Sequence, residues 1–167
     1  MKFLREYIRM LKVKDPALKS GWEVFLYPSF IVQIYYRIAH FLYLHKHYFW
    51  ARYFSEKGKR KTGIEIHPGA TIGKNLFIDH GSCVVIGETA IIGDNVVMHH
   101  GVTLGGVVDT KSKRHPTIED NVMIGAHAQI LGNIVVHKNA KIGAGSIVLD
   151  NVDENATIVG VYKKRQK

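Results

Sequence analysis

The sequence predicts a mainly β protein, a parallel β-helix of six-residue repeats that follows a short α-helical amino-terminal region. The first observation is a period of six within residues 118–152. Aliphatic residues stand at every sixth position, namely Ile118, Ile124, Ile130, Val136, Ile142 and Val148. An α-helix needs apolar residues three to four positions apart and an ordinary strand needs every second one, so neither explains this spacing. Short strands joined by turns do, because three such units close one triangular coil.

The second observation is a small or branched residue four places after each of those positions. These residues are Val122, Ala128, Ile134, Ala140, Ser146 and Val152. The two sets are expected to stack from coil to coil and to fill one interior column. The same spacing runs upstream in two shifted registers that begin at Ile66 and Ile86, so extra residues must stand at the corners.

The third observation is a break in the repeat at residues 107–116, which read Val-Val-Asp-Thr-Lys-Ser-Lys-Arg-His-Pro. These residues are mostly polar and basic and do not continue the period. We expect them to form a loop that leaves the coil. Loops on a rigid scaffold often carry function, so this loop is a candidate for chemistry.

The amino-terminal region has apolar residues at helical spacing. Residues 1–11 predict a short amphipathic helix with Lys and Arg on its outer side. Asp15 and Pro16 are typical of a helix start, with Asp15 as the N-cap and Pro16 at the first helical position.

Residues 22–44 are strongly apolar and aromatic, but polar and charged residues interrupt them, which argues against a membrane span. They predict two helices broken near Pro28, and residues 48–54 extend the helical region. We interpret residues 56–62 as a basic link into the coil. The alternative use for this basic face is an interfacial contact with a membrane, but packing within the protein is the interpretation we adopt.

We therefore divide the chain into a helical region (1–62), a β-helix (63–160) with its loop (107–116), and a basic tail (161–167). A β-helix has open ends and flat outer faces, which the helices and copies of the same chain would cover. A homotrimer is the simplest closed arrangement for a three-sided prism, with pairing of trimers into a hexamer left open.

The composition limits the partners. Lys and Arg number 23 against 14 Asp and Glu, and the net charge of +9 favours an anionic partner. No RNA- or DNA-reading motif accompanies this charge, so a polyanionic cofactor is preferred to nucleic acid. Cys83 is the single cysteine and cannot form an internal disulfide, which is typical of a reducing compartment and predicts a cytoplasmic protein. Its residue type alone favours a small buried hydrophobe.

The ten histidines divide into two groups. Four are interpreted as surface or packing residues: His40, His45, His47 and His137. Six lie in or beside the coil: His67, His80, His99, His100, His115 and His127. Histidine is the side chain whose unperturbed pKa suits base catalysis near neutral pH.

One carboxylate stands at a suitable distance from these histidines. Glu65 precedes Asp79 and His80 by close to one coil, so stacking of coils would bring Glu65 near His80. A carboxylate there would fix the tautomer of the imidazole.

Five motifs, taken in this order, resemble the serine O-acetyltransferases. They are Gly-Ile-Glu-Ile-His-Pro-Gly-Ala-Thr-Ile-Gly (63–73), Ile-Asp-His-Gly (78–81), Val-Ile-Gly-Glu-Thr (85–89), Gly-Val-Thr-Leu-Gly-Gly (101–106) and Lys-Arg-His-Pro-Thr-Ile (113–118). Asp-Pro-Ala (15–17) and the apolar helices after it resemble that family's amino-terminal region, so the similarity covers nearly the whole chain. It implies a left-handed β-helix that transfers acetyl from acetyl-CoA to the hydroxyl of L-serine, the first step of cysteine biosynthesis.

The resemblance also implies roles for individual residues. His80 would be the general base, Glu65 stands where the family has a partnering carboxylate, often an aspartate, and His115 would contact the reacting serine and the oxyanion. The substrate-binding residues that it implies are Asp15 for the amino group, Arg114 for the carboxylate, and Asp79 and His115. His80 and the loop lie about two coils apart, so we expect each active site to form between neighbouring subunits.

Acetyl-CoA is implied as a co-substrate, with no permanently bound cofactor and no metal. The implied contacts along its pantetheine arm are Gly105, Gly106, Gly125, Ala126 and Ala128. The charges of Lys111 and Lys113 in the loop suit the CoA phosphates.

The chain departs from the family pattern at three places. Val107, Val108 and Asp109 stand where Thr-Gly-Lys is usual, which leaves the contacts of the loop with CoA open. Tyr162 stands where a proline is usual. The sequence stops at Lys167 without the terminal isoleucine that the family docks into O-acetylserine sulfhydrylase, so we expect no complex with that enzyme.

Three alternatives stay open. The first is acetylation of another hydroxyl or amine, such as that of a sugar, although Asp15 with Arg114 favours an amino-acid acceptor. The second is a zinc-binding β-helix of the carbonic-anhydrase type, for which the three-histidine spacing is not evident. The third is a non-catalytic relative, which the change at Val107 and Val108 would favour.

Overall fold

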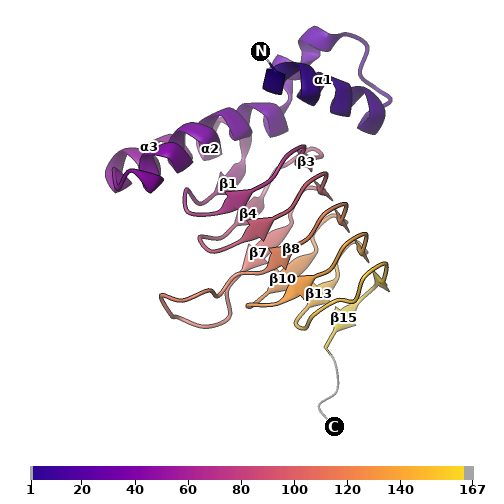
Figure 1. Ribbon diagram of the computed structural model, residues 1–167. Coiled ribbons are helices and arrows are strands. Elements are labelled where there is room, and N and C mark those ends of the chain that lie inside the picture. Colours follow the sequence, from indigo (N-terminus) through magenta and orange to yellow (C-terminus); the bar gives the residue numbers. More distant parts are fainter. Residues whose placement is uncertain (1, 164–167) are drawn as a thin grey trace.

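Helices cover one end of the molecule in the computed structural model, which describes residues 2–163 (Figure 1). They are α1 (Lys2–Lys14), the 3₁₀ helix η1 (Gly21–Leu26), α2 (Pro28–Leu44) and α3 (Tyr48–Thr62). α2 and α3 pack against each other and against β1 (Ile64–Ile66), the first strand of the coil. The helices therefore cap the first coil, as the sequence predicted, and the later coils extend away from them (Figure 1).

The strands form three parallel sheets, which are the three faces of a prism. Sheet A holds β1, β4 (Val84–Ile86), β7 (Thr103–Gly105), β10 (Gln129–Leu131), β13 (Ile147–Val148) and β15 (Val161–Tyr162). Sheet B holds β2 (Thr71–Ile72), β5 (Ile91–Ile92), β8 (Thr117–Ile118) and β11 (Val135–Val136). Sheet C holds β3 (Phe77–Ile78), β6 (Val97–Met98), β9 (Met123–Ile124), β12 (Lys141–Ile142) and β14 (Thr157–Ile158). Each strand pairs with its equivalent in the next coil, so the predicted β-helix is confirmed.

The repeat positions form the interior. All six residues of the main period, from Ile118 to Val148, are at most 2% exposed, and the six residues four places later are also buried. Burial of one such aliphatic side chain contributes about 1.5–3 kcal/mol, so the column stabilises every coil against its neighbours. The shifted registers upstream join the same core through Ile66 and Ile86.

Three columns of corners join the sheets. The histidine corner leads from sheet C to sheet A and contains residues 79–83, 99–102, 125–128 and 143–146. The loop corner leads from sheet A to sheet B and contains residues 67–70, 87–90, 106–116 and 132–134. The asparagine corner leads from sheet B to sheet C and repeats an asparagine with φ near 60°: Asn75, Asn95, Asn121 and Asn139. Asparagine tolerates this left-handed conformation better than most residues, which suits it to a repeated sharp turn.

One expected helix start is wrong. Asp15 follows the end of α1, and its Oδ1 accepts a hydrogen bond from the backbone N–H of Ala17 (2.8 Å), so it shapes a turn instead of capping a helix. The next helix, η1, begins at Gly21 because Ser20 and Glu23 form a capping box that satisfies the first free N–H groups. The break near Pro28 is confirmed, since α2 begins there.

The expected basic link at residues 56–62 is also wrong, because α3 continues to Thr62. Lys59, Arg60 and Lys61 occupy its last turn, where positive charge favours a helix carboxyl terminus. Gly63 ends the helix with φ 72°, a conformation that glycine adopts without strain.

Three further expectations concern Cys83, the end of the coil and the helices. Cys83 is exposed with φ 61°, so its interpretation as a buried hydrophobe is wrong. Strand β15 takes in Val161 and Tyr162, which we had assigned to the tail, and residues 164–167 of that tail lie outside the described residues. Within residues 2–163, no helix is both long and apolar enough to cross a membrane.

Candidate active site

The candidate residues separate onto two columns of the prism. Asp79 and His80 lie in the histidine corner, and Arg114 and His115 lie in the loop corner. The two corners stand at opposite ends of the strands of sheet A, and a three-residue strand spans about 10 Å. Within residues 2–163, no hydrogen bond or ion pair joins the Asp79–His80 pair to the Arg114–His115 pair. One chain therefore presents two separate groups of candidate residues.

His80 stands exposed at the histidine corner. Its side chain is 75% exposed, and its Nε2 lies 3.7 Å from Oδ2 of Asp79. The same Asp79 oxygen lies 3.3 Å from Nδ1 of His99, so this carboxylate stands between two imidazoles. The ring of His80 also approaches the ring of His100 edge to face, with centroids 5.9 Å apart. An exposed imidazole with a free edge can reach a substrate on the outside of the coil.

Asp15 lies close to this corner although it comes from the helical region. The phenol of Tyr27 donates a short hydrogen bond to its Oδ2 (2.5 Å), and the Ala17 N–H donates to its Oδ1. The Tyr27 bond is the largest cause that lowers the pKa of Asp15, the Ala17 bond adds to it, and His80 makes a smaller electrostatic contribution. Asp15 is thus an oriented carboxylate near His80, as a partner for an ammonium group requires.

The expected contact between Glu65 and His80 is absent from the described chain. Glu65 instead accepts a hydrogen bond and ion pair from Lys59, with Nζ and Oε2 2.5 Å apart. The turn at Gly63 folds the end of α3 back beside β1, which places the Lys59 ammonium opposite Glu65. The carboxylate that does face His80 is Asp79, so a catalytic role for Glu65 remains a prediction.

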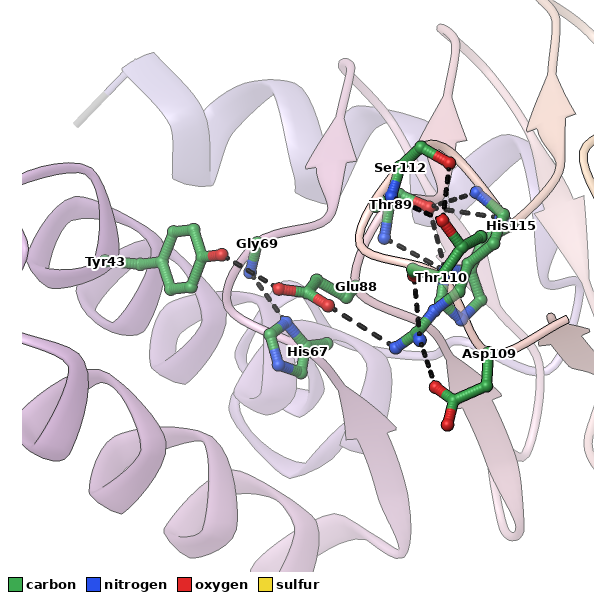
Figure 2. A network of polar contacts seen from close by, with 10 residues as sticks. Tyr43, His67, Gly69, Glu88, Thr89, Asp109, Thr110, Ser112 and His115 are labelled. Atoms are coloured by element: carbon green, nitrogen blue, oxygen red, sulfur yellow. Dashed lines mark hydrogen bonds and ion pairs between the residues drawn. The ribbon is translucent and has the colours of Figure 1, made fainter.

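His115 is fixed in a dense polar network at the loop corner (Figure 2). It is 7% exposed, and its Nδ1 accepts hydrogen bonds from the backbone N–H of Thr89 (3.1 Å) and faces the Thr89 hydroxyl (2.9 Å). Burial is the main cause that lowers the pKa of His115, followed by the neighbouring cations of Arg114 and Lys113. The imidazole is therefore neutral at neutral pH.

Arg114 is held by acceptors of its own chain. Its guanidinium lies 3.5 Å from Oε2 of Glu88, 3.4 Å from Oδ1 of Asp109 and 3.2 Å from the carbonyl of Thr110. Glu88 also accepts a hydrogen bond from the hydroxyl of Tyr43 on α2 (3.0 Å), which ties this corner to the helical cap (Figure 2). A substrate carboxylate would have to share or replace these contacts.

The expected cofactor contacts also divide between the corners. Gly105 and Gly106 lie beside the loop, whereas Gly125 and Ala126 lie in the histidine corner. Lys111 is exposed, while Lys113 donates a hydrogen bond to the backbone carbonyl of His115. Burial lowers the pKa of Lys113.

Ala128, an expected contact of the cofactor, lies inside the coil. Its side chain is fully buried in the interior column. Its backbone N–H donates to the carbonyl of Gly125, and its carbonyl accepts from the N–H of Thr103. Ala128 therefore packs in the coil, and its part in cofactor binding remains a prediction.

The other histidines follow their expected division. Nδ1–H of His40 donates a hydrogen bond to the carbonyl of Pro68 (2.7 Å), His137 pairs with Glu119 (3.3 Å), and His45 and His47 are exposed. No cluster of three or more His, Cys, Asp or Glu side chains in the described part of the chain is arranged to hold a metal ion.

Sequence reasoning gave no role to Thr89, Glu88 or Tyr27, which hold His115, Arg114 and Asp15. The first two stand in the Gly-Glu-Thr motif, which contributed to the resemblance but suggested no contact. Their partners lie 26 residues away in the sequence, and only the coil geometry brings them together.

A three-sided coil of six-residue repeats with polar corners is the architecture of hexapeptide-repeat proteins, a class that includes transferases. Consistent with this class, a family model described as bacterial transferase hexapeptide (six repeats) matches residues 115–150. Serine acetyltransferase of Bacillus subtilis is 52% identical over 161 residues, which are 96% of this chain and 74% of the relative. Serine acetyltransferase of Helicobacter pylori is 51% identical over 152 residues, covering 90% of this chain and 89% of the relative. The chain belongs to the serine acetyltransferase family.

Solved structures agree with the sequence comparisons. The Neisseria gonorrhoeae serine acetyltransferase in complex with serine superposes with a TM-score of 0.91 at 41% identity, over 98% of this chain and 68% of that chain. The Brucella abortus enzyme in complex with coenzyme A gives 0.92 at 41% identity, over 96% and 65%. The fold is the left-handed β-helix of this family.

Proposed function

We propose that the protein transfers the acetyl group of acetyl-CoA to the hydroxyl oxygen of L-serine, giving O-acetyl-L-serine and CoA. The observation that carries the proposal is the pair of complementary corners: an exposed imidazole beside an oriented carboxylate, and a buried neutral imidazole beside a guanidinium. These groups match the needs of an amino-acid acceptor and of acyl transfer. The relatives solved with serine and with coenzyme A support the same pair of substrates.

The chemistry requires a base, because a serine hydroxyl is a poor nucleophile at neutral pH. His80 accepts the hydroxyl proton as the oxygen attacks the thioester carbonyl carbon. The C–O bond forms and the carbonyl oxygen takes up negative charge. When this intermediate collapses, the C–S bond breaks and the proton on His80 passes to the departing CoA sulfur.

The loop corner supplies the groups that stabilise charge. His115 donates a hydrogen bond to the oxyanion, which lowers the barrier because the donor is already in place. Arg114 binds the serine carboxylate and Asp15 binds the serine ammonium. Glu65 remains a candidate to stabilise protonated His80 if subunit contacts release it from Lys59.

The separation of the corners supports an active site between subunits. In a homotrimer the histidine corner of one prism would face the loop corner of the next, and each interface would hold one complete site. The exposed aromatic side chains of α2 and α3, including Phe49 and Trp50, would then be available for the pairing of trimers. This assembly belongs to a cytoplasmic enzyme of cysteine biosynthesis with no permanently bound cofactor.

Release of CoA thiol from acetyl-CoA tests the function directly. L-serine should give the highest kcat/KM in a panel that includes L-threonine, L-homoserine, an amino sugar and a sugar without an amine. If an amino sugar gives a higher kcat/KM than L-serine, the natural acceptor is a sugar and not L-serine. A rate no higher than the thiol release without acceptor would indicate a non-catalytic relative.

A further inference from the structure

Thr89 lies at the centre of the loop-corner network (Figure 2). Its Oγ1 accepts hydrogen bonds from the backbone N–H of Arg114 (3.0 Å) and of His115 (3.1 Å), and it lies 2.9 Å from Nδ1 of His115. A threonine hydroxyl has one proton and two lone pairs. Both lone pairs are occupied by N–H groups that can only donate, so the hydroxyl proton points to Nδ1.

A second donor converges on the same nitrogen. The backbone N–H of Thr89 lies 3.1 Å from Nδ1 of His115, and a backbone amide cannot accept. Nδ1 therefore carries no proton, and the single ring proton of the neutral imidazole sits on Nε2. Protonation of Nδ1 would lose both hydrogen bonds in a buried site.

The ring also packs closely against Gly87. A Cβ atom on Gly87 would lie 2.0 Å from Cδ2 and 2.1 Å from Nε2 of His115, so the ring packs directly against the glycine backbone. The imidazole cannot turn over in its place without moving Gly87 or giving up Thr89. Its orientation and its tautomer are set together.

We propose that Thr89 is a positioning residue that fixes His115 as the Nε2–H tautomer, so that His115 acts as a hydrogen-bond donor and never as the base. This inference rests on the proposed acetyl transfer and divides the work between its two histidines. His80 moves the proton, and His115 stabilises the oxyanion. His115 is thereby excluded as an alternative base, because its only unprotonated nitrogen is already occupied by two donors.

Two substitutions of Thr89 distinguish the role of its hydroxyl from the role of its packing. Thr89→Val keeps the shape and removes the hydroxyl, whereas Thr89→Ser keeps the hydroxyl. We expect kcat to fall about 10- to 100-fold in Thr89→Val, the size of loss seen when a hydrogen-bond partner that orients a metal-ligating histidine is removed, with KM for acetyl-CoA little changed. Thr89→Ser should retain most of the wild-type kcat. Thr157→Val, at an exposed position of β14, is the matched control and should behave as wild type.

The tautomer is read independently by two-bond ¹H–¹⁵N correlation spectra of the histidine-labelled protein at neutral pH. The His115 signals are assigned by their loss in His115→Gln. The wild type and Thr89→Ser should show protonated Nε2 and unprotonated Nδ1, and Thr89→Val should show a mixture of the two tautomers.

The outcomes distinguish this inference from the proposed function. A wild-type His115 that carries its proton on Nδ1 would overturn the inference, and so would a Thr89→Val variant with an unchanged tautomer and an unchanged kcat. Thr89→Ser losing as much activity as Thr89→Val would also overturn it, since the hydroxyl would then have no special part. If the tautomers behave as expected but the wild type does not acetylate L-serine, the proposed function fails and the assignment of the His115 tautomer stands.

Discussion

The histidine corner and the loop corner use the same side chain in opposite surroundings. His80 has a side chain that is 75% exposed and a carboxylate 3.7 Å away, whereas His115 is 7% exposed, is held at Nδ1 by Thr89 and packs against Gly87. A proton acceptor needs an open edge that the substrate can reach. A donor to an oxyanion acts best when it is fixed before the reaction begins. In the proposed reaction each corner therefore supplies one half of the chemistry, the base at His80 and the oxyanion donor at His115.

Loss of His80 should lower kcat more than any other substitution in the two corners. His80→Ala is expected to lower kcat on the order of 10²–10⁴-fold, the usual contribution of a positioned general base. His80→Asn, which is closer in shape, should give a similar loss. Steady-state kinetics with L-serine measure the effect, and His137→Ala at the asparagine corner is the control. If His80→Ala keeps most of the wild-type kcat, the general base does not lie in the histidine corner.

Gly87→Ala tests the rigidity of the loop corner. The added Cβ would collide with the His115 ring, so the imidazole must shift. A displacement of about 1 Å at a catalytic group lowers rates on the order of 10²-fold, and we expect a loss of that size in kcat. Gly21→Ala is the matched control, because its Cβ would lie 3.6 Å from its nearest neighbour. Equal activity of the two variants would show that the position of His115 does not matter.

Asp15→Asn should have a smaller effect that appears in KM. Asparagine can still accept the hydrogen bond from Ala17, so the turn is retained while the charge is lost. A hydrogen bond to a charged group contributes about 1.5–3 kcal/mol, which predicts a rise of about tenfold or more in KM for L-serine with little change for acetyl-CoA. An unchanged KM for L-serine would leave Asp15 with its structural role in the turn alone.

The smallest expected effect is on stability in mild acid. Burial lowers the pKa values of His115 and His67 below the usual 6.5 of histidine, so the unfolded chain binds protons more readily than the folded chain. The free energy of unfolding therefore has its full value above about pH 6.5. It decreases as the pH falls toward the pKa values of the two histidines in the folded chain. Chemical denaturation at several pH values measures this slope, which should be shallower in His67→Gln. An identical slope in that variant would contradict a lowered pKa of the half-buried His67.

The repeat made the coil predictable, because only one fold places every sixth aliphatic residue in a continuous core. Ile124 and Ile130 could be assigned to that core without any structure. The contacts between side chains at the corners were harder to predict, because shifts in register and the inserted loop decide which side chains lie close together. Glu65 looked like the partner of His80 from coil spacing, yet the helix that ends at Gly63 brings Lys59 beside it. The link between Thr89 and His115 depends on hydrogen-bond directions that no sequence pattern contains.

In the proposed trimer, each active site joins the histidine corner of one subunit to the loop corner of another. Mixed assemblies of His80→Ala and His115→Ala subunits test it most directly, since each variant alone is expected to be nearly inactive. After the two chains are unfolded together in equal amounts and refolded, random assembly places an intact His80 opposite an intact His115 in about a quarter of the sites. Recovery of about a quarter of the wild-type activity is expected. Mixtures no more active than the separate variants would contradict it and place the whole site within one chain.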